Sequence, residues 1–145
     1  MNINDYRIYN FDIHDSEGGG HYAFCKTLVG GGTQDGEGRS ITFMCKWFVL
    51  DYAEFAFKDL ELTPPAAKIK EGETPIDIGL NNALKIVWRK LMVQKGVKPS
   101  EMARMLKVSP NSLHRYMEFE KNTGIEIIER AFSLLGHRLE LSVKD

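Results

Sequence analysis

A run of polar side chains between residues 107 and 121 has the chemistry needed to bind DNA. Hydroxyl, amide, imidazole and cationic groups hydrogen-bond to base edges and phosphates. We expect base-edge contacts from Asn111, His114 and Arg115. We expect phosphate contacts from a second set, namely Lys107, Ser109, Ser112 and Lys121.

Two short helices joined by a tight turn would position these side chains. Ala103 is small where the helices must come close, and Leu106 and Leu113 fall where a shared core needs apolar groups. Ser109 followed by Pro110 supplies an N-cap and a favoured first residue for the second helix. The spacing predicts a helix-turn-helix, and the alternative is two ordinary helices of a small bundle.

The turn between these helices contains one residue that departs from the usual pattern. Lys107 stands where such turns commonly take a positive φ, and it is not Gly. A left-handed lysine would carry a strain of about 1 kcal/mol or somewhat more. We therefore expect a turn that differs in detail from the common form.

Charge is divided unevenly along the 145 residues. Residues 1–80 hold 7 Lys or Arg against 13 Asp or Glu, whereas residues 81–121 hold 9 against 3. The basic block contains the predicted helix-turn-helix, as a polyanionic ligand requires. The acidic block suits a basic partner, and the alternative is that it only keeps the surface solvated.

Carboxylates near the N-terminus raise the question of metal-dependent nuclease chemistry. The candidates are Asp12, Asp15, Glu17, Asp35 and Glu37. Two-metal phosphoryl transfer needs carboxylates that converge from rigid elements on ions about 4 Å apart, whereas most of these lie in glycine-rich turns. The four histidines, His14, His21, His114 and His137, are scattered in the sequence. We predict no catalytic residue, no metal, no cofactor and no enzyme activity.

The N-terminal part reads as three strands, a helix and a last strand. Strands are predicted over 6–13, 21–25, within 30–38 and over 75–78, and the first two form a hairpin. An amphipathic helix is predicted over 39–58, with a core stripe that includes Phe48, Tyr52 and Phe55. We interpret its aromatic residues as core, although some could form a partner surface. The unit is βββαβ.

The C-terminal part reads as helices followed by a strand with no partner. Further helices are predicted over 81–95 and 125–135, and residues 138–143 alternate as a strand does. An identical strand from a second copy would pair with it through Leu139, Leu141 and Val143. We expect a homodimer or a higher oligomer, and an α+β protein with domains at 1–78 and 79–145.

The remaining composition is that of a cytoplasmic protein. Cys25 and Cys45 have no CxxC spacing, so we expect free thiols. The N-terminus lacks a basic region followed by an apolar run, and no stretch approaches the ~20 apolar residues of a membrane span. We expect no membrane partner.

The chain resembles the HicB-type antitoxins of bacterial toxin–antitoxin pairs, in the version with a C-terminal helix-turn-helix. The motifs that carry the resemblance are Glu101-Met102-Ala103-Arg104, Leu113 with Arg115, Thr123 with Ile125, Leu135-Gly136 and Leu139-Glu140-Leu141. Glu17-Gly18-Gly19, Thr33-Gln34 and Leu62 with Pro64 or Pro65 resemble its N-terminal part. The chain departs from the family at residues 26–30, and in the aromatic character of 41–57.

The resemblance implies a partial RNase H-like N-terminal domain that binds and blocks a small basic HicA-type RNase toxin. It also implies a C-terminal domain that dimerises and represses its own operon by binding operator double-stranded DNA. The alternative is a stand-alone, phage-type helix-turn-helix repressor whose N-terminal domain senses a ligand or oligomerises.

Overall fold

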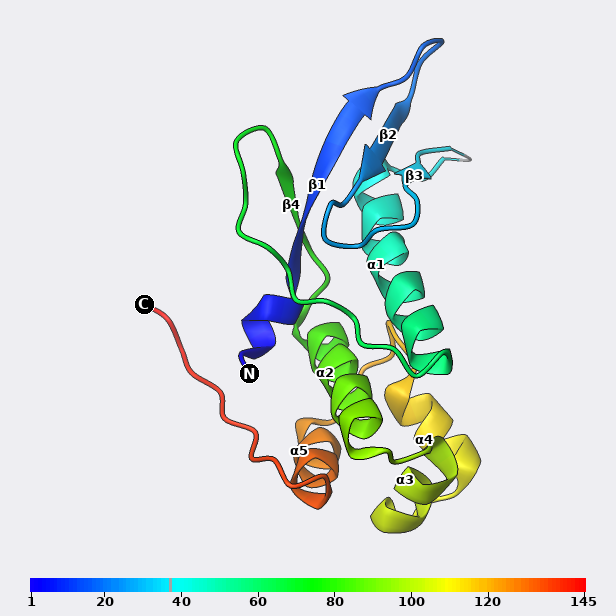
Figure 1. Ribbon diagram of the computed structural model, residues 1–145, viewed down its shortest axis with the longest axis vertical. Helices are drawn as coiled ribbons and strands as arrows, with labels where there is room; N and C mark the ends of the chain where they lie inside the picture. The colour runs from blue at the N-terminus through cyan, green and yellow to red at the C-terminus, as the bar shows by residue number, and fades with distance from the viewer. Residues whose placement is uncertain (37) are drawn as a thin grey trace.

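The computed structural model describes residues 1–36 and 38–145. It confirms an α+β architecture, in which a four-stranded antiparallel sheet lies at one end of the molecule and a group of helices at the other (Figure 1). The elements are η1 (Ile3–Tyr6), β1 (Ile8–Asp15), β2 (His21–Phe24), β3 (Thr33–Gln34), α1 (Ile41–Lys58), β4 (Thr74–Asp77), α2 (Leu80–Lys95), α3 (Pro99–Leu106), α4 (Pro110–Met117) and α5 (Ile125–Leu134).

The sheet has the strand order β3-β2-β1-β4, which confirms the predicted βββαβ sequence and the opening hairpin. Side chains alternate along β1, so Tyr9 and Phe11 are buried while their neighbours are more exposed. The predicted start of the first strand at Tyr6 is wrong. Asn2 caps a short 3-10 helix by accepting a hydrogen bond from the backbone N–H of Asn4, and that helix ends at Tyr6.

Helix α1 packs on one face of the sheet, and its bounds agree with the predicted helix. Ser40 caps its N-terminus by accepting a hydrogen bond from the backbone N–H of Phe43 at 3.2 Å. The predicted core stripe is wrong at Phe55, which is 65% exposed. Apolar residues surround most of α1, so periodicity alone could not select its buried face. The fully buried side chains are Cys45, Val49, Leu50, Ala53 and Ala56.

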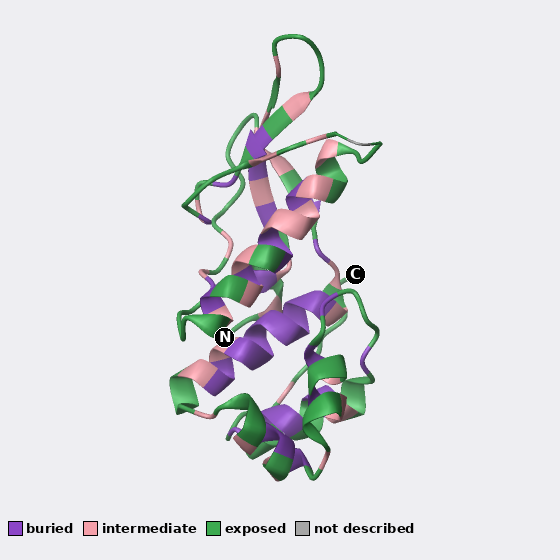
Figure 2. Ribbon diagram, turned by 90° about the vertical axis from the view of Figure 1, so that its right-hand side faces the viewer, coloured by how far each residue is buried: buried purple, intermediate pink, exposed green. Residues whose placement is uncertain are grey.

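Helix α2 lies at the centre of the molecule and is buried along most of its length (Figure 2). All residues from Asn82 to Arg89 are buried, because η1, α1 and α5 pack around the helix. Gly96 ends it in a left-handed conformation, with φ of 71°. One hydrophobic core runs through both parts of the chain. The domain boundary between residues 78 and 79 stays a prediction.

The chain leaves α5 as an extended tail that passes the N-terminus (Figure 1). Residues 137–143 line a common groove with Met1–Asn4. Within the described chain, residues 138–145 pair with no strand of the sheet, so the dimerising strand stays a prediction. Among the described helices, none combines the length and apolar character that crossing a bilayer requires.

Candidate DNA-binding and partner surfaces

The turn between α3 and α4 contains a C-cap that ends α3 and an N-cap that begins α4. Lys107 ends α3 with φ of 58°, in the left-handed conformation that is common in such turns, so the expected departure from the common form is wrong at this residue. The N–H of Val108 donates to the carbonyl of Ala103 at 3.0 Å, which closes a Schellman-type turn. Ser109 caps α4 by accepting a hydrogen bond from the N–H of Ser112 at 3.1 Å. Lysine therefore occupies a position where glycine would be unstrained.

The two faces of α4 have opposite chemistry. Leu113 and Met117 are buried against a core that includes Ala103 and Leu106. Asn111, His114 and Arg115 are exposed, as expected. The Arg115 guanidinium donates to the Ser112 hydroxyl at 3.3 Å, and the Ser109 hydroxyl donates to the same oxygen at 3.0 Å. A short chain of hydrogen bonds thus holds the polar side chains on one turn of the helix.

Two expected phosphate contacts lie at the edges of this face. Lys107 is exposed in the turn before α4. Lys121 is exposed in the segment that follows α4, four residues beyond the last helical residue Met117. The structure therefore brings Ser109, Ser112 and Arg115 into direct contact, and leaves Lys121 on a separate segment.

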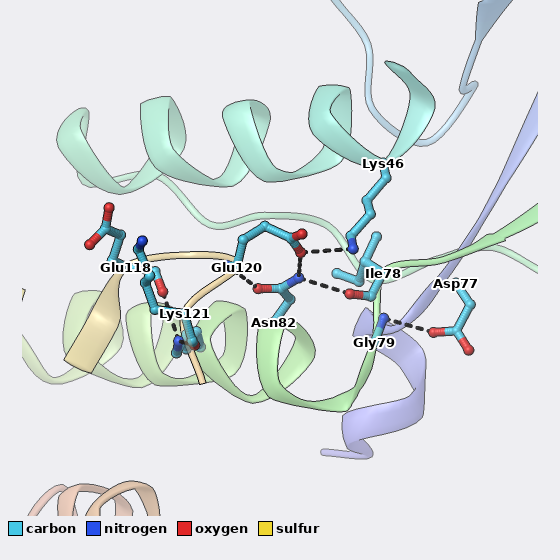
Figure 3. Close-up of polar contacts among 9 residues, drawn as sticks. Lys46, Asp77, Ile78, Gly79, Asn82, Glu118, Glu120 and Lys121 are labelled. Atoms are coloured by element: carbon cyan, nitrogen blue, oxygen red, sulfur yellow. Dashed lines mark hydrogen bonds and ion pairs between the residues drawn. The ribbon is translucent and has the colours of Figure 1, made fainter. Parts of the chain in front are cut away.

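The segment after α4, residues 118–123, is fixed by polar side chains of α2 (Figure 3). The Asn82 side chain accepts from the N–H of Glu120 at 2.9 Å and donates to its carboxylate at 2.6 Å. The same amide donates to the carbonyl of Ile78 at 2.9 Å. Asn81 makes a matching pair of hydrogen bonds with the backbone of Thr123. The exit of α4 is thereby tied to the start of α2.

A cation from α1 completes this arrangement. The Lys46 ammonium lies 2.8 Å from the Glu120 carboxylate and points toward it from the facing helix (Figure 3). These contacts lower the pKa of Glu120 against the opposing effect of partial burial. Glu120 itself has φ of 68°. The segment after α4 therefore contacts both α1 and α2.

Two residues of the basic block are buried, which reduces the cationic surface that the sequence predicted. Lys85 is fully buried and its ammonium donates to the carbonyls of Glu118 and Lys121. Burial lowers the pKa of this ammonium to about 8. The Arg89 guanidinium stacks 4.1 Å from the centre of the Phe119 ring, and burial lowers its pKa to about 10. Neither cation is available to a nucleic acid.

Sequence reasoning missed these structural roles of Asn82, Lys85 and Arg89. The available signal was their spacing in α2, where Asn82, Lys85 and Arg89 recur every three or four residues and so share one face of the helix. Their partners could not be inferred, because the carbonyl of Glu118 lies 33 residues from Lys85 along the chain.

The sequence of the chain is similar to those of one group of known proteins, although no family model matches the chain. Antitoxin HicB 2 of Photorhabdus laumondii subsp. laumondii is 27% identical over 117 residues, covering 80% of this chain and 79% of the relative. Antitoxin HicB 1 of the same organism is 25% identical over 63% of this chain and 57% of the relative. Antitoxin HicB of Pseudomonas fluorescens is 31% identical over 52% of this chain and 51% of the relative.

The chain is similar to the HicB antitoxins. The resemblance that its sequence motifs indicated is thereby confirmed. The chain spans about half the length of the last two relatives and 79% of the first. The printed names describe all three relatives as antitoxins.

The four candidate catalytic carboxylates that the structure describes do not converge on one point. Asp12 faces Lys26 at 3.6 Å, whereas Asp15 and Asp35 flank the ring of His21 at 3.5 and 2.8 Å. Glu17 is exposed in the hairpin turn, and Glu37 lies outside the described residues. In the described part of the chain, no group of three His, Cys, Asp or Glu side chains is arranged to hold a metal ion.

The aromatic side chains of α1 divide between the core and the surface, which partly corrects their interpretation as core. Those packed against the core without being fully buried are Trp47, Phe48, Tyr52 and Phe57. Phe43 and Phe55 are exposed. Small side chains such as Ala53 and Ala56 take the most buried positions, because they let the helix approach the sheet closely.

The predicted dimerising residues differ in exposure along the tail. Leu139 is half-buried against the core, whereas Leu141 is 57% and Val143 94% exposed. Leu141 and Val143 thus expose apolar side chains on an extended segment that pairs with no strand of the described chain.

Proposed function

We propose that this chain is the antitoxin of a toxin–antitoxin pair and the repressor of its own operon. Residues 1–78, as a partial RNase H-like domain, would bind and block a small mRNA-cleaving HicA-type toxin. Residues 79–145 would bind operator DNA as a homodimer. The similarity to HicB antitoxins supports the first role, and the exposed polar face of a capped α4 is the single observation that most directly supports the second.

In this proposal α3 and α4 form a helix-turn-helix, and α4 is its recognition helix. Asn111, His114 and Arg115 contact base edges in the major groove, because they are exposed opposite the buried face of α4. Ser109, Ser112, Lys107 and Lys121 contact phosphates. The cations of the basic block that remain exposed are Lys95, Lys98, Arg104, Lys107, Arg115 and Lys121, and they supply the attraction to a polyanion.

A dimer is part of the proposal because one recognition helix reads only a few base pairs. Two-fold mates read half-sites about 34 Å apart. The tail residues Leu139, Leu141 and Val143 would pair with the same strand of a second copy, since their backbone groups have no partner strand in the described chain. Such pairing would cover the two exposed apolar side chains.

The DNA half is tested with the double-stranded fragment that lies immediately upstream of this chain's own coding sequence. We expect saturable binding that weakens steeply with salt and exceeds binding to a shuffled fragment by at least about a thousandfold. Removal of residues 138–145 is expected to give monomers that bind weakly. Equal binding to both fragments would remove the operator role, and an undiminished dimer would remove the proposed dimer strand.

The toxin half is tested by co-expression with the protein encoded by the adjacent reading frame. We expect a stable complex at low salt. We also expect co-expression of this chain to restore the growth that the neighbour inhibits when it is expressed alone. Growth inhibition that this chain does not relieve would contradict the antitoxin role. Operator binding without any such partner would favour a stand-alone repressor.

A further inference from the structure

A groove runs along one side of α1, beside the edge strand β3. It has a volume of about 540 Å³ and lies between α1 and the segment around residues 29–33. Trp47, Phe48, Tyr52 and Phe55 line it from the helix, and Val29 lines it from the facing segment. Phe55 is 65% and Val29 73% exposed. Such contiguous apolar surface, rimmed by polar groups, marks an interaction site more often than scattered exposed residues do.

The rim of this groove is acidic. Asp51, Asp59 and Glu61 line it, and among the described lining residues none is basic. The pKa of the Asp51 carboxyl is raised by partial burial and by the neighbouring Glu54 carboxylate. Lys58, the basic residue beside the rim, lies over the Phe55 ring with its ammonium 5.6 Å from the ring centre. Three carboxylates thus surround an apolar floor without a cation among the lining side chains.

The charge of the groove rim and the position of the tail argue against DNA, a second copy and the chain's own tail as occupants of the groove. DNA is disfavoured because its phosphates would meet carboxylates. A second copy docking symmetrically would place the same acidic rim against itself, as a two-fold interface requires. The chain's own tail lies elsewhere, in a groove shared with Met1–Asn4. The remaining occupant is a protein segment that combines an apolar side chain with flanking Lys or Arg.

We infer that the groove on α1 is the docking surface for a basic protein partner, which inserts an apolar side chain between Phe55 and Val29. Lys or Arg residues of the partner then pair with Asp51, Asp59 and Glu61. This inference rests on the proposed antitoxin function, since the basic RNase toxin is the partner that has this chemistry. It adds which face of the N-terminal half binds that partner.

The test measures binding of the purified adjacent-frame protein to the full chain by calorimetry at two salt concentrations. Phe55→Arg is expected to weaken binding at least about tenfold, because an aromatic anchor near the centre of an interface carries much of its energy. Phe43→Arg is the matched control, since Phe43 is an exposed aromatic residue of the same helix outside the groove lining. It is expected to change binding less than about threefold.

A second pair of variants tests the rim without altering the apolar floor. Asp59→Lys with Glu61→Lys is expected to weaken binding and to reduce its dependence on salt. Glu71→Lys, an exposed acid outside the groove, is the control. All five substituted positions are exposed, so each variant should keep the wild-type circular dichroism and unfolding midpoint. If Phe55→Arg fails to fold, the Asp59→Lys with Glu61→Lys variant decides the test.

The outcomes separate the inference from the function on which it rests. Wild-type binding that the groove variants leave unchanged overturns the docking surface and leaves the antitoxin role standing. Loss of binding in the groove variants alone, with both controls intact, supports it. Absence of any wild-type binding removes the antitoxin role and the docking surface together.

Discussion

The outer faces of α1 and α4 differ in chemistry although each is the exposed side of a helix packed on the same core. The groove side of α1 is lined by aromatic side chains with carboxylates at its rim. The face of α4 is polar, and its hydroxyl and guanidinium groups are already linked by hydrogen bonds. One face suits an apolar, basic partner, and the other suits a polyanion. The two proposed recognition tasks would thus be separated by chemistry as well as by position.

The two faces are nevertheless connected through one polar cluster. Glu120, which follows α4, contacts Asn82 of α2 and Lys46 of α1. Variants of this cluster and of each face show how independent the faces are.

The largest effect is expected from a variant that disrupts the polar cluster around Glu120. Asn82→Ala removes three hydrogen bonds from a buried side chain and leaves the N–H of Glu120 without its partner. We expect the free energy of unfolding to fall by about 2–4 kcal/mol, because buried polar groups lose their hydrogen-bond partners. Urea unfolding monitored by Trp fluorescence measures this value. Asn122→Ala, at an exposed position of the same segment, is the control; equal losses in both variants would contradict the role of Asn82.

The second-largest effect is expected on DNA binding, from a substitution on the exposed face of α4. Arg115→Ala should weaken operator binding by about 1–3 kcal/mol and relax its sequence preference, because a bidentate contact to a base edge is lost. Fluorescence anisotropy with the upstream fragment and a shuffled fragment measures both quantities. Arg130→Ala, on the exposed side of α5, is the control. Equal losses for both DNA fragments would show that Arg115 contacts only phosphate.

The same two faces show which parts of the structure could be predicted from sequence. The α4 unit could be predicted because its determinants are local: the Ser109 cap, Pro110 and the left-handed Lys107 act within a few residues. The buried side of α1 could not, since apolar residues surround the helix and only contact with the sheet selects the small ones. The burial of Lys85 depends on carbonyls more than 30 residues away. The predicted pairing of the tail depends on a second copy of the chain, because residues 138–145 pair with no strand within the described chain.

A smaller effect separates the stability of the α3–α4 turn from its charge. Lys107→Gly should raise the free energy of unfolding by about 0.5–1 kcal/mol, because glycine adopts a positive φ without strain. Lys107→Ala should leave stability nearly unchanged. Both variants should reduce the salt slope of DNA binding by about one unit if Lys107 contacts a phosphate. An unchanged slope in both would remove that contact, whatever the stability of the turn.

The smallest effect concerns the hairpin edge of the N-terminal half, where His21 and Asp35 form a half-buried pair. The His21 ring lies 2.8 Å from the Asp35 carboxylate, and this hydrogen bond raises the pKa of His21 above its ordinary value of 6.5. Hydrogen bonds from the backbone and ring of His21 lower the pKa of Asp35 below 3.8. The stabilisation from His21 is therefore complete below pH 6.5 and is lost as pH rises through the raised pKa. That from Asp35 is present above pH 3.8 and is lost as pH falls.

Asp35→Asn tests this pair, because an amide oxygen can still accept from the backbone N–H of His21, which lies 2.8 Å from the carboxylate. The unfolding midpoint of the variant should fall below that of the wild type mainly near about pH 5, and the difference should shrink above about pH 7.5. Thermal unfolding across this range measures it. A difference that stays constant with pH would show that the contact stabilises the hairpin edge by geometry alone. In either case neither the groove on α1 nor the face of α4 should change its binding, since this pair lies on β2 and the segment after β3.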